Sequence, residues 1–185
     1  LELTLSADRC ADISRLSLCG VNFGYFAPCG YVAPTYYDHV GAGFLKSFTA
    51  GFLTTCGLCA VGSPCVDDGE ETPLHGTISN TPSEIVNYWT DDKYIHVMAR
   101  IRDAQIFGRQ LLLDREYLIS LDSNEMTMTD TVTNIGAREV PLQMLYHCNI
   151  GYPLLDEDTE LSIPSVEVTP RNAHAAEDIQ NCLKM

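Results

Sequence analysis

Apolar and polar residues alternate along much of this chain with a period of two. In the stretch 94–101, Ile95, Val97, Ala99 and Ile101 all fall on the same side. Because successive side chains of a β-strand point to opposite faces, this alternation predicts a strand with one buried face. Alternation or a β-rich composition marks four further stretches: 1–6, 111–121, 125–134 and 160–168. Turn signals such as LDSNE and TNIGARE lie between them, so we expect antiparallel hairpins or meanders.

Helical periodicity is weak, and the best candidate for a helix is a short turn over 172–179. With many strands and almost no helix, the predicted fold class is all-β, in sandwich or barrel form. No internal repeat, low-complexity tract or linker interrupts the sequence. Residues 1–185 are therefore interpreted as a single domain.

The segment 19–58 has a different character, because it combines glycine, proline and aromatic residues. Long connecting segments in compact domains are usually functional or packed as arms. Its aromatic residues have two interpretations: they fill the edge of the sandwich, or they stack against the C–H faces of a sugar. The pattern alone favours the first.

Composition narrows the class of partner. The chain is 45% hydrophobic with a mean hydropathy of -0.02, which is enough to bury a sizeable core. No run approaches the roughly 18 apolar residues of a membrane span. The chain carries 11 Lys and Arg against 25 Asp and Glu, a net charge of -14. This charge disfavours nucleic-acid phosphates and anionic membranes and is compatible with a neutral ligand, so we expect no nucleic acid and no membrane as partner.

The eight cysteines are interpreted mostly as buried, reduced thiols of a cytoplasmic protein. Disulfide frameworks belong mainly to short secreted chains, and this chain has a large apolar content instead. Cys56, Cys59 and Cys65, followed by His75, have the spacing of half a zinc site, but no second ligand pair accompanies them. We therefore expect no metal and no cofactor.

The loop PLHGTISN, 73–80, supplies the first candidate site residue. His75 precedes Gly76, which permits a positive φ or a close approach of the backbone, and hydroxyl and amide side chains follow. A lone loop histidine is more often an ordinary surface residue. The neighbours of His75 favour a ring presented to a ligand.

The second candidate lies in the stretch 141–158. Alternation places Gln143, Leu145, His147 and Asn149 on one face of a strand. One interpretation of His147 is a core histidine whose polar groups are satisfied. The other is a histidine that transfers a proton near neutral pH.

A third pair of candidates precedes the aromatic segment, in the stretch SADRCADISRL, 6–16. Arg9 and Asp12 form a buried ion pair in the simpler interpretation. In the functional interpretation they are directed at substrate hydroxyls, because charged groups make the stronger hydrogen bonds.

Taken together, ADRCADIS, FLTTCGL, PLHGTISN, YHCNIGYPLL and PRNAHAAE resemble the aldose 1-epimerase (galactose mutarotase-like) superfamily, specifically its aldose-1-epimerase-like branch. The resemblance covers essentially all 185 residues. It implies a large antiparallel β-sandwich, the galactose mutarotase-like supersandwich, whose concave sheet binds a monosaccharide substrate.

The resemblance also implies an isomerase that opens and recloses a sugar ring by acid/base chemistry. His75 would bind and polarise the anomeric end of the sugar, and His147 would be the acid toward the ring oxygen. Four further residues would bind the substrate or support the histidines: Arg9, Asp12, Gln143 and Asn149.

One departure from the family concerns the base. Well-studied members take the anomeric proton with a glutamate late in a longer chain, and no acidic residue here corresponds to it. We therefore expect the catalytic base beyond residue 185. The chain is interpreted as the N-terminal portion of a longer protein, in which a C-terminal segment or a partner chain completes the fold.

Three functions remain open. The first is a sugar mutarotase or a related epimerase. The second is a non-catalytic carbohydrate-binding protein on the same fold, since one fold hosts several functions. The third is a metal-dependent sugar isomerase or epimerase that uses the cysteine-rich neighbourhood of His75 or the acidic loop 67–71.

Overall fold

A four-stranded antiparallel sheet forms the larger layer of the structure, a computed structural model that describes residues 1–67, 69–177 and 179. Its strand order is β12-β11-β10-β9. The bounds are Ser83–Thr90 for β9, Tyr94–Ala104 for β10, Gln110–Ser120 for β11 and Met126–Asn134 for β12. The strands predicted at 94–101, 111–121 and 125–134 are therefore confirmed.

The register of this sheet follows from its alternating pattern. β10 and β11 pair without interruption, from Tyr94 opposite Ser120 to Ala104 opposite Gln110. Along most of β11, fully buried residues alternate with partly buried ones. A slip of one residue would turn the buried set outward, so the core fixes the pairing.

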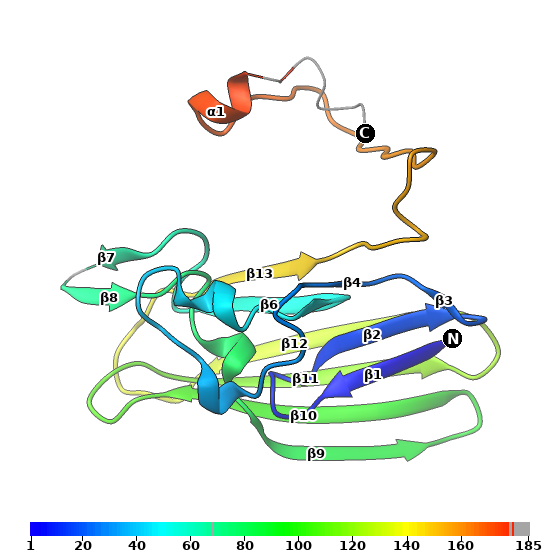
Figure 1. Ribbon diagram of the computed structural model, residues 1–185. Helices are drawn as coiled ribbons and strands as arrows, with labels where there is room; N and C mark the ends of the chain where they lie inside the picture. The colour runs from blue at the N-terminus through cyan, green and yellow to red at the C-terminus, as the bar shows by residue number, and fades with distance from the viewer. Residues whose placement is uncertain (68, 178, 180–185) are drawn as a thin grey trace.

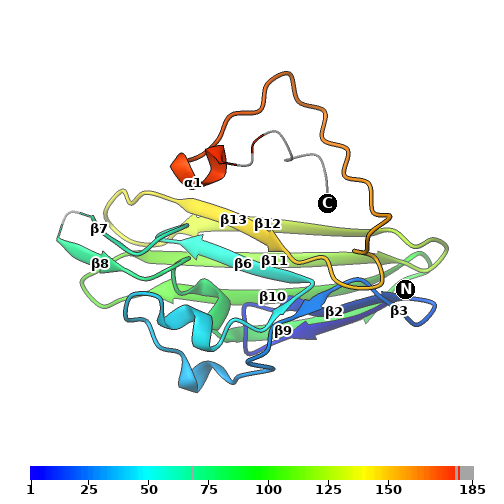
Figure 2. The same ribbon diagram turned by 45° about the horizontal axis from the view of Figure 1, so that its top comes forward.

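The opposing layer is assembled from shorter antiparallel pieces (Figure 1). One piece has the order β1-β2-β3, with β1 at Glu2–Ser6, β2 at Asp12–Leu18 and β3 at Val21–Asn22. A second pairs β6, Leu53–Leu58, with β13, Gln143–Cys148, and both lie in front of the large sheet in Figure 2. Two small pairs complete the layer: β4 (Tyr25–Phe26) with β5 (Ala50–Gly51), and β7 (Cys65–Asp67) with β8 (Glu70–Thr72). The architecture is thus an all-β sandwich, as the sequence predicts.

The core lies between the two layers and has two parts. In one, Ile101 and Leu113 of the large sheet pack near Leu58 of β6. In the other, Tyr117 of β11 packs with Ile13 of β2. These contacts fix β2 and β6 over the large sheet, and β6 in turn carries β13.

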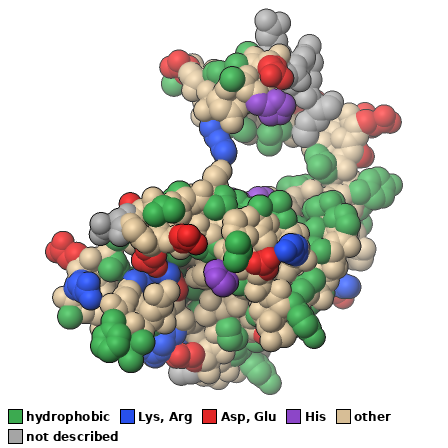
Figure 3. All heavy atoms as spheres, turned by 60° about the vertical axis from the view of Figure 1, so that its left-hand side comes forward, with side chains coloured by type: hydrophobic (Ala, Val, Ile, Leu, Met, Phe, Trp, Pro, Cys, Tyr) green, Lys and Arg blue, Asp and Glu red, His purple; other side chains and the backbone are tan. Residues whose placement is uncertain are grey.

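The segment after β13 differs from its prediction. The stretch 160–168 forms no strand, although its composition is β-rich, and Val166 and Ile163 are exposed. Figure 1 shows this segment leaving the sandwich, and Figure 3 shows it standing clear of the body. The helical turn expected at 172–179 is present as α1, Ala173–Ala176, although residue 178 lies outside the described residues. None of the described residues belongs to a helix long and apolar enough to cross a membrane.

The cysteines also differ in part from expectation. All seven in the described ranges are free thiols, but only Cys10 and Cys56 are buried, while Cys59 is partly buried and the others are exposed. Cys182 lies outside the described residues. Exposure follows from position, because Cys19, Cys29 and Cys65 lie in turns or in a small edge hairpin.

Candidate functional site

The His-Gly loop packs directly against β6. The N–H of Gly57 in β6 donates to the carbonyl of His75 at 3.0 Å, and the N–H of Thr77 donates to the carbonyl of Gly57 at 3.1 Å. Gly76 has a φ of +72°, and a Cβ atom there would lie 2.2 Å from the carbonyl oxygen of Gly57. Only glycine fits that conformation and that space. The glycine beside His75 is therefore required by the contact with β6.

His75 is held in one orientation by Gly62. It adopts a φ of +60°, which is uncommon for a residue with a side chain. Its N–H donates to the carbonyl of Gly62 at 3.0 Å, and the N–H of Gly62 donates to its ring Nδ1 at 3.2 Å. Because Nδ1 accepts a hydrogen bond, the neutral ring carries its proton on Nε2. Nε2–H is then the donor of the ring.

The protonation state of His75 fits this assignment. Burial, and then the proximity of His147, lower the pKa of His75 from its ordinary value of 6.5. The neutral ring is therefore favoured near neutral pH.

His147 lies opposite His75 on the neighbouring element. β13 pairs with β6 from Gln143 opposite Leu58 to Cys148 opposite Leu53, which places His147 beside Thr54. The ring centroids of His75 and His147 are 5.7 Å apart and the rings are perpendicular. Within the described chain, the ring nitrogens of His147 make no hydrogen bond to protein, so they are available to a ligand.

Two phenylalanines complete the surroundings of the histidine pair. Phe44 belongs to the short 3-10 helix Gly43–Lys46 and lies 5.5 Å from the ring of His75, centroid to centroid. Phe48 packs edge-on against His147 at 5.3 Å and stacks on Phe44 at 5.1 Å. Phe44 is buried and Phe48 partly exposed. The sequence places both in the aromatic segment, but their separation of four residues does not reveal that they meet these histidines.

Arg9 and Asp12 are buried, but they do not form the expected ion pair with each other. The guanidinium of Arg9 donates to the carbonyls of Val32 and Ser47 at 2.8 and 3.0 Å. The carboxylate of Asp12 accepts from the backbone and the hydroxyl of Thr55 in β6 at 2.8 and 2.6 Å. The hydrogen-bond partners of both residues are protein atoms, and their expected role as substrate ligands stays a prediction.

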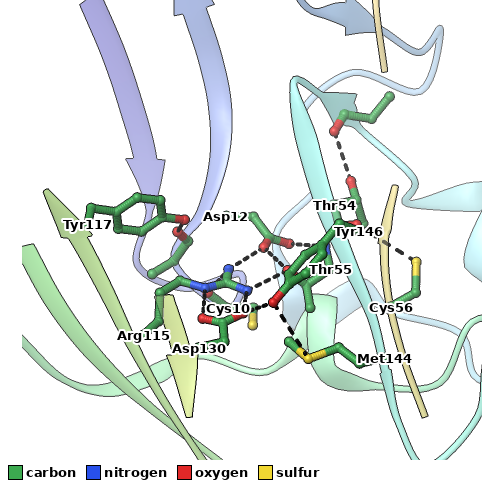
Figure 4. A network of polar contacts seen from close by, with 12 residues as sticks. Cys10, Asp12, Thr54, Thr55, Cys56, Arg115, Tyr117, Asp130, Met144 and Tyr146 are labelled. Carbon is green, nitrogen blue, oxygen red and sulfur yellow. Dashed lines mark hydrogen bonds and ion pairs between the residues drawn. The ribbon is translucent and has the colours of Figure 1, made fainter. Parts of the chain in front are cut away.

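Asp12 belongs instead to a buried network centred on Arg115 (Figure 4). The Arg115 guanidinium donates to Asp12 at 2.7 Å, to the hydroxyl of Thr55 at 2.7 Å, and to Asp130 at 2.8 and 2.7 Å. Tyr146 of β13 donates its hydroxyl to Asp130 at 2.9 Å. Burial, followed by the hydrogen bond to Asp130, raises the pKa of Tyr146 to about 12, so the phenol stays protonated and keeps donating.

This network ties three elements to the large sheet. Arg115 and Asp130 stand opposite each other on β11 and β12. Their partners are Asp12 on β2, Thr55 on β6 and Tyr146 on β13. Because Tyr146 precedes His147, the network fixes the strand that carries His147. It unites residues far apart in the chain, and sequence reasoning does not detect it.

The remaining two predicted residues contact backbone near the histidines. Gln143 is exposed, and its Oε1 accepts from the N–H of Val61 at 3.1 Å. Asn149 is buried, and its amide donates to the carbonyls of His147 at 2.9 Å and Ala50 at 3.3 Å. Gln143 and His147 therefore share one face of β13, whereas Asn149 follows the end of the strand.

Carboxylates do not contact the histidine pair among the described residues. The only histidines there with a carboxylate oxygen within 4.0 Å are His96 and His174. In the same ranges, no three His, Cys, Asp or Glu side chains are grouped so that they could hold a metal ion. Cys56 points into the core and Cys65 lies on the exposed β7, so their sequence spacing does not bring them together; Asp68 of the acidic loop lies outside the described residues.

The fold matches one class of protein. Over 98% of its length, the chain superposes on 49% of the crystal structure of a putative aldose 1-epimerase from Klebsiella pneumoniae subsp. pneumoniae MGH 78578, with a TM-score of 0.90 and 25% sequence identity. The protein therefore has the all-β fold of an aldose 1-epimerase-like protein and spans about half of that relative's length.

The chain belongs to the family described as "Domain of unknown function (DUF4432)", whose sequence profile matches residues 1–185. A comparison with curated proteins gives no match.

Proposed function

We propose that this protein contributes the acid side of a sugar mutarotase, an enzyme that interconverts the anomers of an aldose. The observation that carries the proposal is the perpendicular pair of His75 and His147, 5.7 Å between ring centroids. The two rings are in direct contact, so a monosaccharide lying over the pair can meet one donor at its anomeric end and a second at its ring oxygen.

His75 serves as the neutral donor. Its Nδ1 is occupied by the N–H of Gly62, so Nε2–H is the group that reaches the anomeric oxygen. Because the pKa of His75 is lowered, its ring is neutral near neutral pH. The neutral ring polarises the anomeric oxygen by donating a hydrogen bond and does not transfer its proton.

His147 serves as the general acid. Its imidazolium gives a proton to the ring oxygen while a base removes the proton of the anomeric hydroxyl. The bond between C1 and the ring oxygen breaks, and C1 becomes an aldehyde carbonyl. After rotation about C1–C2 the new hydroxyl adds to the other face of the carbonyl, and both protons return. Bonds and protons balance over the cycle.

The proposal requires a base besides the two histidines. No described carboxylate lies within 4.0 Å of either ring, so the base has to be another group brought in at the open side of the pair. We propose a carboxylate outside residues 1–185, since the matched relative has about as much chain again.

Phe48 supplies the apolar part of the site. It is partly exposed beside His147, and an aromatic face suits the C–H face of a pyranose. Arg9 and Asp12 have protein partners in the structure, and their role as ligands of the sugar hydroxyls stays a prediction.

A non-catalytic sugar-binding protein is the second candidate, and the absence of a described carboxylate beside the histidines favours it. The two functions make different predictions for one variant. His147→Gln keeps a hydrogen-bonding side chain but cannot act as an acid, so it should abolish catalysis and leave most of the sugar affinity.

The test is saturation-transfer NMR of anomer exchange on a panel of aldoses, with the whole protein as its gene encodes it. We expect accelerated exchange for at least one aldose and a loss of roughly 100-fold or more in His147→Gln. His96→Gln is the matched control, because His96 lies on the large sheet, stacked on Trp89. Exchange that persists in His147→Gln contradicts the proposal; sugar binding by calorimetry without any exchange supports the second candidate.

A further inference from the structure

A short chain of hydrogen bonds connects β13 to the ring of His75. Oε1 of Gln143, the first residue of β13, accepts the N–H of Val61 at 3.1 Å. The next N–H along the chain, that of Gly62, donates to Nδ1 of His75 at 3.2 Å. The carbonyl of Gly62 accepts the N–H of His75 at 3.0 Å.

We propose that Gln143 is a positioning residue for His75: by holding the Val61–Gly62 turn, it fixes His75 as the Nε2–H donor. This role goes beyond the proposed function and rests on it only for its effect on turnover. Gln143 acts through the loop, and its contact is with the Val61 backbone.

The turn needs such an anchor because of its composition. Gly62 has a φ of +90°, and a Cβ there would meet nothing within 4 Å, so packing does not restrain it. Glycine is the most flexible residue in an unrestrained turn. A rotation of the Val61–Gly62 peptides would turn the Gly62 N–H away from Nδ1, and the neutral ring could then carry its proton on either nitrogen.

The anchor also sets the geometry of the histidine pair. Gln143 and His147 lie on the same face of β13, and the ladder to β6 holds the whole strand in register. One strand therefore carries His147 directly and orients His75 through Gln143. The distance between the two rings then depends on a single rigid element, which is the usual requirement for a precise site.

A neutral acceptor suits this position better than a charged one. A carboxylate at 143 would also accept the Val61 N–H, but its charge would favour the imidazolium forms of nearby histidines. Burial and His147 keep the pKa of His75 low, and an amide at 143 leaves that balance intact.

The test is long-range ¹H–¹⁵N NMR of the five histidines, which reports the tautomer of each ring. The whole protein is used, and the His75 signals are assigned with His75→Gln. We compare Gln143→Met, which keeps the length but lacks the acceptor, with Gln143→Glu, which keeps an acceptor. Gln110→Met at the start of β11 is the matched control.

We expect the wild type to show His75 as Nε2–H. In Gln143→Met the ratio of the Nε2–H to the Nδ1–H tautomer should fall by about three- to tenfold, the effect of weakening one hydrogen bond, and the pKa of His75 should rise. Gln143→Glu should keep the Nε2–H tautomer, and Gln110→Met should match the wild type.

An unchanged tautomer ratio in Gln143→Met overturns the proposal, and so does a wild-type ring protonated on Nδ1. Turnover separates the two proposals: if the wild type accelerates no sugar, the mutarotase function fails while the tautomer result stands. If turnover is present, Gln143→Met should lower kcat by about three- to tenfold with little change in KM. A rise in KM with an unchanged tautomer means that Gln143 binds the sugar directly.

Discussion

His75 adopts a left-handed backbone conformation inside the candidate site, with a φ of +60°. Such conformations cost roughly 1–3 kcal/mol in residues with a side chain and persist only where the surroundings impose them. Here the surroundings are the hydrogen bonds to Gly57 and Gly62. The strained backbone conformation therefore occurs at the residue whose ring orientation determines the geometry of the candidate site.

The first prediction concerns Gly76. Gly76→Ala places a methyl group 2.2 Å from the carbonyl of Gly57 and forces a φ of +72° on alanine, so we expect a loss of about 3 kcal/mol or more in the free energy of unfolding. Gly20→Ala is the matched control: its φ is +82°, but nothing lies within 4 Å, so only the conformational cost of about 1–2 kcal/mol applies. Urea denaturation measures both. Equal losses would show that the close packing on β6 contributes nothing.

The second prediction concerns pH. Because the pKa of His75 is lower in the folded protein than its ordinary 6.5, the unfolded chain takes up this proton first as the pH falls. The contribution of His75 to stability is therefore constant above pH 6.5 and declines as the pH falls from there to the folded pKa. The free energy of unfolding of the wild type, taken relative to that of His75→Gln, should therefore decrease from pH 7.5 to pH 5.

Urea denaturation over a series of pH values provides this measurement. His174→Gln is the control, because His174 is 92% exposed. Parallel curves for the wild type and His75→Gln would contradict a lowered pKa.

Residue-level predictions from the sequence were accurate where local geometry decides and failed where partners are distant. The glycine after His75 signals a close approach, and the structure shows one. Arg9 and Asp12 lie three positions apart and invite pairing, yet Asp12 pairs with Arg115 on the far layer. Asp12 and Arg115 are too far apart in the sequence to form a local pattern, so a single sequence does not reveal that they pair.

At the scale of elements, the buried network links β2, β6 and β13 to the large sheet. Arg115 is wholly buried between Asp12 and Asp130. A buried ion pair adds little net stability but is costly to break from one side, because the remaining charges stay buried without a partner.

The third prediction follows from this asymmetry. Arg115→Met should lower the free energy of unfolding by about 3–5 kcal/mol. Arg102→Met is the control, because the Arg102–Glu84 pair lies on the exposed face of the large sheet, and we expect a nearly unchanged denaturation midpoint. Equal effects of the two substitutions in urea denaturation would contradict the structural role of the network.

The strands show where the alternation of apolar and polar residues is enough to predict an element. β10, β11 and β12 follow their alternation because each has a neighbour on the sheet and a core beneath it. The stretch 160–168 has the composition of a strand but no partner edge in the described chain, and Pro164 interrupts it. β-propensity describes a fit to a sheet, so it predicts a strand only where a sheet is present.

At the scale of the molecule, the sandwich brings together two segments that are distant in the sequence, the His-Gly loop and β13. β6 lies at the centre: the His-Gly loop packs on one side of it, and β13 pairs along the other. The sequence pattern predicts the strand that carries His147 and singles out both candidate histidines, but their approach was indicated only by family resemblance. Charged side chains of both signs are dispersed over the face in Figure 3, in keeping with a neutral ligand.

The central claim is that His75 and His147 act together on one sugar. The most direct test is the rate of anomer exchange by saturation-transfer NMR in the wild type, His75→Gln, His147→Gln and the double variant of the whole protein. Residues that act as a unit are not additive. The account predicts that the double variant is about as slow as His147→Gln alone. Losses that multiply in the double variant, or a wild type without exchange, would contradict it.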